Sequence, residues 1–144
     1  MNLIHRIFKD GIAIEKVNLT RATINEAQEI RDNLLDDIDC KKIIVDLSMC
    51  DYIDSTFFGA MVFAYRVLRH QECEIVLVIS NTFLSKNFIY NEITSVFNVY
   101  HSMKAALHTL NNIDKNTDAL RNENTAEKRG PAKIGQMQFM LDHE

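Results

Sequence analysis

The stretch KKIIVDLSMCDYIDSTFFGAMVFAYR, residues 41–66, places a strand, a polar corner and a helix in direct succession. Its first eight residues have the length and the β-branched composition of a buried strand. From Ser55 to His70 the pattern predicts a helix, and serine often begins one because its hydroxyl accepts a hydrogen bond from the first turn. The stretch therefore predicts a strand-to-helix crossover, with Ser55 as the N-cap at the corner.

Strands alternate with helices on both sides of this stretch. Before it, LIHRIFK and IAIEKVN flank Asp10-Gly11, a pair typical of a β-hairpin, and residues 23–39 have helical spacing behind a capping box of Thr23 and Glu26. After it come a strand (CEIVLVIS), a helix (TFLSKNFIYNEI), a short edge strand (VFNVY) and a last helix (SMKAALHTL). The order predicts an α/β fold with a mixed sheet of four to five strands and about four helices, packed mainly on one side.

The helix at residues 55–70 carries more apolar surface than packing on a sheet requires. We expect one stripe to face the sheet, formed by Phe58, Met61, Val62, Tyr65 and Leu68. The remaining apolar side chains are then covered either by a neighbouring helix or by a partner protein. Gly59 is costly within a helix, so we expect the first turn to approach another backbone closely at this position.

Length, charge and hydropathy indicate a single-domain protein and argue against nucleic-acid-binding and membrane-spanning classes. A chain of 144 residues suits one domain, which we expect over residues 1–110, followed by a polar, disordered tail over 111–144. The stretch 134–141 within that tail regains apolar side chains and is either a docking segment or a loose end. The net charge of −4 argues against direct nucleic-acid binding. No apolar run reaches the length of a membrane span and no secretory signal is recognisable, so we expect a cytoplasmic protein.

Side chains of catalytic type are present without a catalytic pattern. Asp46, Asp51 and Asp54 cluster in sequence, but their spacing matches no metal-ligand pattern, and the chain has no Gly-rich phosphate loop. The three cysteines (Cys40, Cys50 and Cys73) are odd in number and lack CxxC spacing, which favours reduced thiols in the core or at its boundary. We expect no enzyme, no metal and no cofactor.

Ser55 has a second interpretation besides capping. A helix N-terminus tolerates an added anion, because its free N–H groups and partial positive charge face that way. A phosphoryl group on Ser55 would add nearly two negative charges beside Asp54 and near Asp51. Such a modification would change the surface potential more than it would stabilise the fold, which suits a switch.

The string KKIIVDLSMCDYIDSTFFGAMV resembles the signature of the STAS domain, as found in anti-sigma-factor antagonists of bacterial partner-switching systems. The family pattern is an apolar strand, Asp-Leu-Ser, a few residues, and then Asp-Ser-Ser/Thr-Gly-Leu-Gly. Downstream, ISNTFLSKNFIYNEITSVFNVYHSMKAAL resembles the closing strand, helix, short strand and helix of the family. The resemblance covers about residues 3–110 and implies a STAS-like fold.

The resemblance implies a phosphorylation-controlled switch that has no catalytic activity of its own. The serine after the motif aspartate, Ser55 here, is the one that a partner phosphorylates, and that partner is both anti-sigma factor and serine kinase. The unphosphorylated antagonist binds this partner, the phosphorylated form releases it, and a PP2C-type phosphatase resets the system. The motif positions implied in partner binding are Asp54, Ser55, Thr56, Phe57, Phe58 and Gly59.

One departure from the family pattern and one alternative function accompany this interpretation. Phe57 stands where the family has its first glycine, and Phe58 replaces the leucine. We expect the bulky ring of Phe57 to change the shape presented to a kinase. The alternative is a STAS scaffold or regulatory subunit of a stress-signalling or transport complex, which would bind its partner without a phospho-switch.

Overall fold

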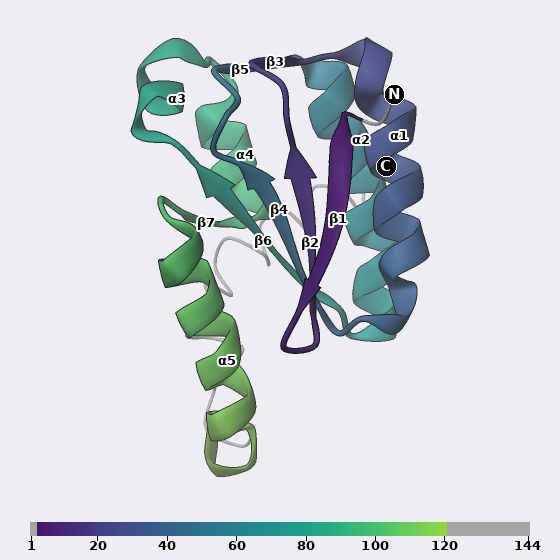
Figure 1. Cartoon of the computed structure of the whole chain (residues 1–144), viewed down its shortest axis with the longest axis vertical. Helices are drawn as coiled ribbons and strands as arrows, with labels where there is room; N and C mark the ends of the chain where they lie inside the picture. The colour runs from purple at the N-terminus through teal and green to yellow at the C-terminus, as the bar shows by residue number, and fades with distance from the viewer. Residues whose placement is uncertain (1–2, 121–144) are drawn as a thin grey trace.

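Five strands form one mixed sheet in the order β1-β2-β4-β6-β7 in the computed structural model, which describes residues 3–120 (Figure 1). Strand β1 is antiparallel to β2, and every other neighbouring pair is parallel. The strands are β1 (Ile4–Lys9), β2 (Ile12–Val17), β4 (Lys42–Leu47), β6 (Glu74–Ile79) and β7 (Asn98–Tyr100). The predicted α/β class, the N-terminal hairpin and the short edge strand are confirmed.

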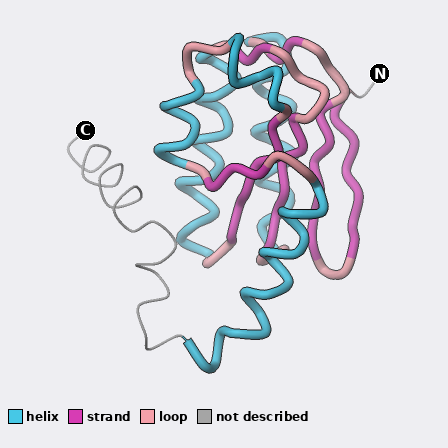
Figure 2. Tube along the Cα trace, turned by 90° about the vertical axis from the view of Figure 1, so that its left-hand side faces the viewer, coloured by secondary structure: helices cyan, strands magenta, loops and turns pink. Residues whose placement is uncertain are grey.

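The β1–β2 hairpin forms one edge of the sheet (Figure 2). Its turn consists of Asp10 and Gly11, with φ angles of 53° and 80°. Two successive positive φ values define the turn type whose twist matches that of the flanking strands, and aspartate and glycine adopt such values at low cost. The hairpin register pairs Lys9 with Ile12 and continues to Ile4 opposite Val17.

Helices cover both faces of the sheet (Figure 1). On one face, α1 (Ile24–Asp36) and α2 (Ser55–Leu68) lie over the larger hydrophobic core, and α5 (Met103–Leu120) lies on the other face over a smaller core. The predicted capping box begins α1, because Thr23 accepts from Asn25 N and donates its own N–H to Glu26 Oε1 at 2.9 Å. The position of α5 explains why residues such as Ile44 are buried on the second face.

The side of α2 that faces the core differs from the predicted stripe. The fully buried side chains are Phe57, Met61, Ala64 and Leu68. Phe58 and Tyr65 are half-buried, and both pack edge to face on Phe97, with ring centres 6.3 and 5.4 Å apart. The prediction is confirmed for Met61 and Leu68, whereas Phe58, Val62 and Tyr65 lie only at the margin of the core and Phe57 and Ala64 take the buried positions. A helix that is apolar all round has no unique stripe, so its rotation is set by the elements beside it.

Two further sequence-based boundaries differ from the structure. The helix predicted over TFLSKNFIYNEI is two helices, α3 (Asn81–Lys86) and α4 (Tyr90–Val96), separated by residues 87–89. Helix α5 continues past the expected end near Leu110 to Leu120, and the stretch 111–120 contains neither glycine nor proline to stop it. The expected docking segment at 134–141 lies outside the described residues.

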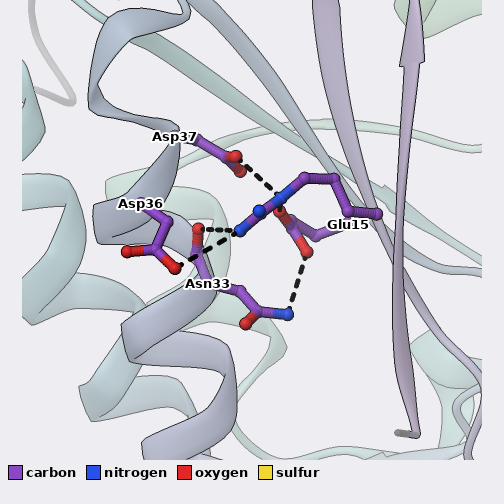
Figure 3. Close-up of polar contacts among 5 residues, drawn as sticks. Glu15, Asn33, Asp36 and Asp37 are labelled. Carbon is purple, nitrogen blue, oxygen red and sulfur yellow. Dashed lines mark hydrogen bonds and ion pairs between the residues drawn. The ribbon is translucent and has the colours of Figure 1, made fainter.

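A buried polar cluster ties the hairpin to the end of α1 (Figure 3). Glu15 on β2 is fully buried, and its carboxylate accepts from Arg6 Nε at 2.8 Å and from Asn33 Nδ2 at 3.2 Å. The same Arg6 Nε lies 3.0 Å from Asp37 Oδ1, and Arg6 Nη2 is 3.9 Å from Asp36. One guanidinium therefore serves two buried carboxyl groups, Glu15 and Asp37.

The two buried carboxyl groups perturb one another. Burial, followed by the hydrogen bond and the charge of Glu15, raises the pKa of Asp37 to about 8, although Arg6 acts in the opposite direction. Asp37 is 2% exposed, and its Oδ2 has no hydrogen-bond partner among the described residues. A buried acceptor without a donor is costly, so the protonated form of Asp37 is favoured at neutral pH.

Candidate functional site

The corner that carries Ser55 lies beyond the carboxyl end of β4, where a second, two-stranded sheet joins the starts of two helices. Strand β3 (Arg21–Ala22) pairs in parallel with β5 (Tyr52–Ile53), with Ala22 opposite Ile53. Helix α1 begins two residues after β3, and α2 begins two residues after β5, so both helices start side by side (Figure 1). Nothing in the sequence pattern had indicated this small sheet.

Asp54 caps both helices at this corner. Its Oδ1 accepts from Phe57 N at 2.8 Å in the first turn of α2, and its Oδ2 accepts from Ile24 N at 2.9 Å at the start of α1. The prediction that Ser55 is the N-cap is therefore wrong: Asp54 is the cap, and Ser55 is the first helical residue. Aspartate caps as well as serine does, and its second oxygen reaches a helix that a hydroxyl could not serve at the same time.

Ser55, Thr56 and Gly59 form the exposed part of the motif. Ser55 and Gly59 are four residues apart, so they lie one above the other on the same face of α2. A Cβ added at Gly59 would have no heavy atom within 4 Å outside its own helix and chain neighbours. The predicted close approach of another backbone at Gly59 is therefore absent, and the surface beside Ser55 is open.

The two phenylalanines of the motif point inward. The Phe57 ring is fully buried in the larger core, and Phe58 is half-buried against Phe97. The expectation that the Phe57 ring changes the shape presented to a kinase is wrong, because this ring fills core volume instead of surface. Of the predicted partner-binding side chains, Phe57 is the one that a partner cannot reach in this structure.

The other side chains of catalytic type do not converge on Ser55. Asp46 Oδ1 accepts from Ser48 N at 3.0 Å, and both oxygens of Asp54 are engaged by helix N–H groups. His101 Nδ1 lies 3.1 Å from Ile79 O. Cys50 is buried beside the corner, and burial raises its pKa to about 12, which keeps it a thiol at neutral pH. The corner thus exposes the Ser55 hydroxyl to solvent, without a catalytic group of the same chain beside it among the described residues.

Neither a metal site nor a membrane-spanning helix is found in the part of the chain that the structure describes. No group of three or more His, Cys, Asp or Glu residues in this part of the chain is arranged to hold a metal ion. None of its helices combines the length and the apolar character that crossing a membrane demands.

Asn87 is a residue at this corner that sequence reasoning missed. Its Nδ2 donates to Asp51 O at 2.6 Å, and its Oδ1 accepts from Ile53 N at 3.2 Å. The contact joins positions more than thirty residues apart in the chain, and no local pattern predicts such a pair. The single available signal is that asparagine is a poor helix former within a stretch that otherwise looks helical.

Replacing Asp54 tests its double role as a cap. We expect Asp54→Ala to lower the free energy of unfolding by about 2 kcal/mol, because each lost cap costs about 1 kcal/mol. Asp54→Asn retains one acceptor oxygen and should lose about half as much. Urea unfolding followed by circular dichroism measures the difference. Asp51→Ala is the matched control, and equal losses in Asp54→Ala and Asp51→Ala would show that Asp54 does not join the two helices.

Comparisons with known proteins agree with this geometry. An anti-sigma factor antagonist from Mycobacterium paratuberculosis superimposes with 15% identity and a TM-score of 0.62, over 74% of this chain and 91% of that one. An anti-sigma-factor antagonist (STAS) domain protein from Planctomyces limnophilus superimposes with 16% identity and a TM-score of 0.62, over 74% of this chain and 95% of that one. The anti-sigma factor antagonist SpoIIAA in its unphosphorylated form superimposes with 10% identity and a TM-score of 0.58, over 77% of this chain and 97% of that one. At these identities the likeness is one of fold. No curated protein matches the sequence. The STAS domain model, however, matches residues 19–106, more than half of the chain. The protein belongs to the STAS domain family.

Proposed function

We propose that the protein is an anti-sigma-factor antagonist whose binding is controlled at Ser55. In its unphosphorylated form it binds an anti-sigma factor that is also a serine kinase, and phosphorylation of Ser55 releases it. A PP2C-type phosphatase restores the binding form. The observation that carries the proposal is the exposure of Ser55 in the first turn of α2, while the neighbouring Asp54 performs the capping.

The corner can accept a phosphoryl group without losing its fold. Ser55 is not needed as a cap, and the first turns of both α1 and α2 direct N–H groups toward the corner. Two of these N–H groups are bound by Asp54, whose negative charge they partly offset. An added charge of nearly −2 on Ser55 would then act mainly on whatever surface covers it.

The face of α2 beyond Ser55 provides an apolar surface for such a partner. Phe63 and Val67 follow Ser55 and Gly59 at intervals of four residues and are 51% and 37% exposed. A partner that covers this face removes apolar area from water, which favours binding. Near Ser55 the partner then contacts either a small hydroxyl or a phosphoryl group. Covering the phosphoryl group would bury its charge, which weakens binding.

Phosphoryl transfer to single variants tests the proposal. We expect the intact mass of the wild-type chain, incubated with its candidate anti-sigma kinase and ATP, to increase by one phosphoryl group. Ser55→Ala should gain none and should keep binding the kinase, and its stability should stay within about 0.5 kcal/mol of wild type because Asp54 is the cap. Ser55→Asp should bind more weakly.

Thr56→Ala provides the matched control, because Thr56 is the adjacent exposed hydroxyl. It should still gain one phosphoryl group. If phosphoryl transfer persists in Ser55→Ala and disappears in Thr56→Ala, the modified residue is Thr56, and our assignment of the switch to Ser55 is wrong.

A STAS scaffold or regulatory subunit is the second candidate. The exposed Phe63 and Val67 favour it, because this apolar part of α2 can bind a partner without any change at Ser55. A scaffold would show no phosphoryl gain, and wild type and Ser55→Asp would bind the partner equally well.

A further inference from the structure

The backbone that leads into Ser55 is held along both edges. On one edge, β5 pairs with β3: Tyr52 N donates to Thr20 O at 3.2 Å, and Asp54 N donates to Ala22 O at 3.1 Å. On the other edge, the Asn87 amide donates to Asp51 O and accepts from Ile53 N. Asn87 therefore takes the place that a third strand would have, using one side chain.

Asn87 is itself anchored in the core. Its N–H donates to Phe83 O at 3.2 Å, and Phe83 is fully buried. Phe83 N in turn donates to Ser80 Oγ at 3.3 Å, and Ser80 follows directly after β6. A short path of hydrogen bonds and buried contacts thus connects the end of the inner strand β6 to the backbone of residues 51–53.

An amide is suited to this position because it offers one donor and one acceptor in a fixed geometry. Ile53 is 1% exposed, so its N–H would be left without a partner if the Asn87 side chain were removed. An unsatisfied buried donor favours local opening of the segment that carries it. That segment ends at Asp54, the N-cap of α2.

We propose that Asn87 is a positioning residue for the Ser55 corner: its amide holds residues 51–53 closed against the core and so fixes how α2 presents Ser55. The clamp is a property of the fold alone, and its effect on phosphoryl transfer rests on the function proposed above. The kinase is not required to detect the clamp.

Cys50 provides a reporter for opening of this segment. It is fully buried, immediately precedes Asp51, and is held by a hydrogen bond from its N–H to Leu47 O at 3.0 Å. Cys73 provides the internal control, because it is also buried but lies just before β6, and its thiol donates to Cys40 O at 3.1 Å. Local opening at the corner exposes Cys50 alone, whereas global unfolding exposes both thiols.

The experiment measures N-ethylmaleimide labelling of each cysteine by peptide mass spectrometry in the full chain. We expect Asn87→Ala to label Cys50 about tenfold faster than wild type, with little change at Cys73, because loss of both hydrogen bonds lowers the cost of local opening. Phe88→Ala is the matched control, because the neighbouring Phe88 ring is fully exposed, and it should label like wild type. Equal acceleration at Cys50 and Cys73, or no acceleration at either, overturns the proposal.

A second measurement separates this clamp from the proposed phospho-switch. With the candidate kinase and ATP, Asn87→Ala should lower kcat for phosphoryl transfer to Ser55 with a smaller effect on KM, because the acceptor is less well oriented. Faster Cys50 labelling with unchanged kcat would show that the clamp does not position Ser55 and would overturn that part of the inference. If wild type accepts no phosphoryl group, the phospho-switch fails, and the labelling alone decides whether Asn87 clamps the corner.

Discussion

Phe57→Gly, the substitution that restores the first glycine of the STAS motif, is expected to lower the free energy of unfolding by about 4–6 kcal/mol. The Phe57 ring is fully buried in the larger core between α2 and the sheet. Truncating a buried phenylalanine to alanine costs about 3–5 kcal/mol, and a glycine within a helix costs about 1 kcal/mol more. That loss is a large fraction of the stability of a small domain, which is about 5–15 kcal/mol.

Thermal and urea unfolding followed by circular dichroism measure this loss. Phe58→Leu, which restores the neighbouring motif leucine, is the matched control. Phe58 is only half-buried, and leucine keeps a large apolar side chain there, so the change should cost less than about 1.5 kcal/mol even with its ring contact to Phe97 lost. A Phe57→Gly protein that unfolds at the same urea concentration as wild type would contradict the assignment of Phe57 to the core.

The free energy of unfolding is expected to fall as the pH rises from about 4 to about 8, through the proton held by Asp37. The pKa of this carboxyl is about 8 in the folded protein, against an ordinary value of 3.8. Between these values the folded state holds a proton that the unfolded state has released, so raising the pH favours unfolding by up to about 1.4 kcal/mol per pH unit. The stabilisation that comes from the proton on Asp37 is fully present below about pH 4 and is lost as the pH rises to about 8.

Asp37→Asn isolates this contribution from all other titrating groups. An asparagine keeps an oxygen for Arg6 and replaces the unpartnered Oδ2 with an amide donor beside Glu15. We expect the stability of the variant to change less with pH, and to exceed that of wild type at pH 9. Asp36→Asn is the control, because Asp36 is exposed and its contact with Arg6 is long. Parallel pH profiles for wild type and Asp37→Asn would exclude a buried, protonated Asp37.

The order of strands and helices could be predicted because local signals determine it. Asp10-Gly11 encodes the hairpin turn in two residues, and Thr23 with Glu26 begins α1 within a single turn. The choice of cap at α2 was not local. Asp54 and Ser55 are adjacent and both suit an N-cap, and the contact from Ile24 N, thirty residues earlier, is what gives Asp54 its second partner.

The rotation of α2 and the long-range polar contacts could not be predicted for a related reason. Phe57 and Phe58 are equally apolar, so periodicity does not decide which of them enters the core. Arg6 with Asp37, and Asn87 with Asp51, each join segments far apart in the chain. The proposed role of Ser55 came from the family motif, whereas its exposure and its separation from the cap came from the structure.

Gly59 is the position in α2 at which the stability of the helix and the proposed binding would favour different residues. The position is exposed, and an added side chain would meet no neighbouring atom, so alanine would suit this helix better by about 1 kcal/mol. No contact among the residues that the structure describes requires glycine there. Selection for stability alone would therefore favour alanine, and a glycine at this exposed position fits the binding surface proposed for α2.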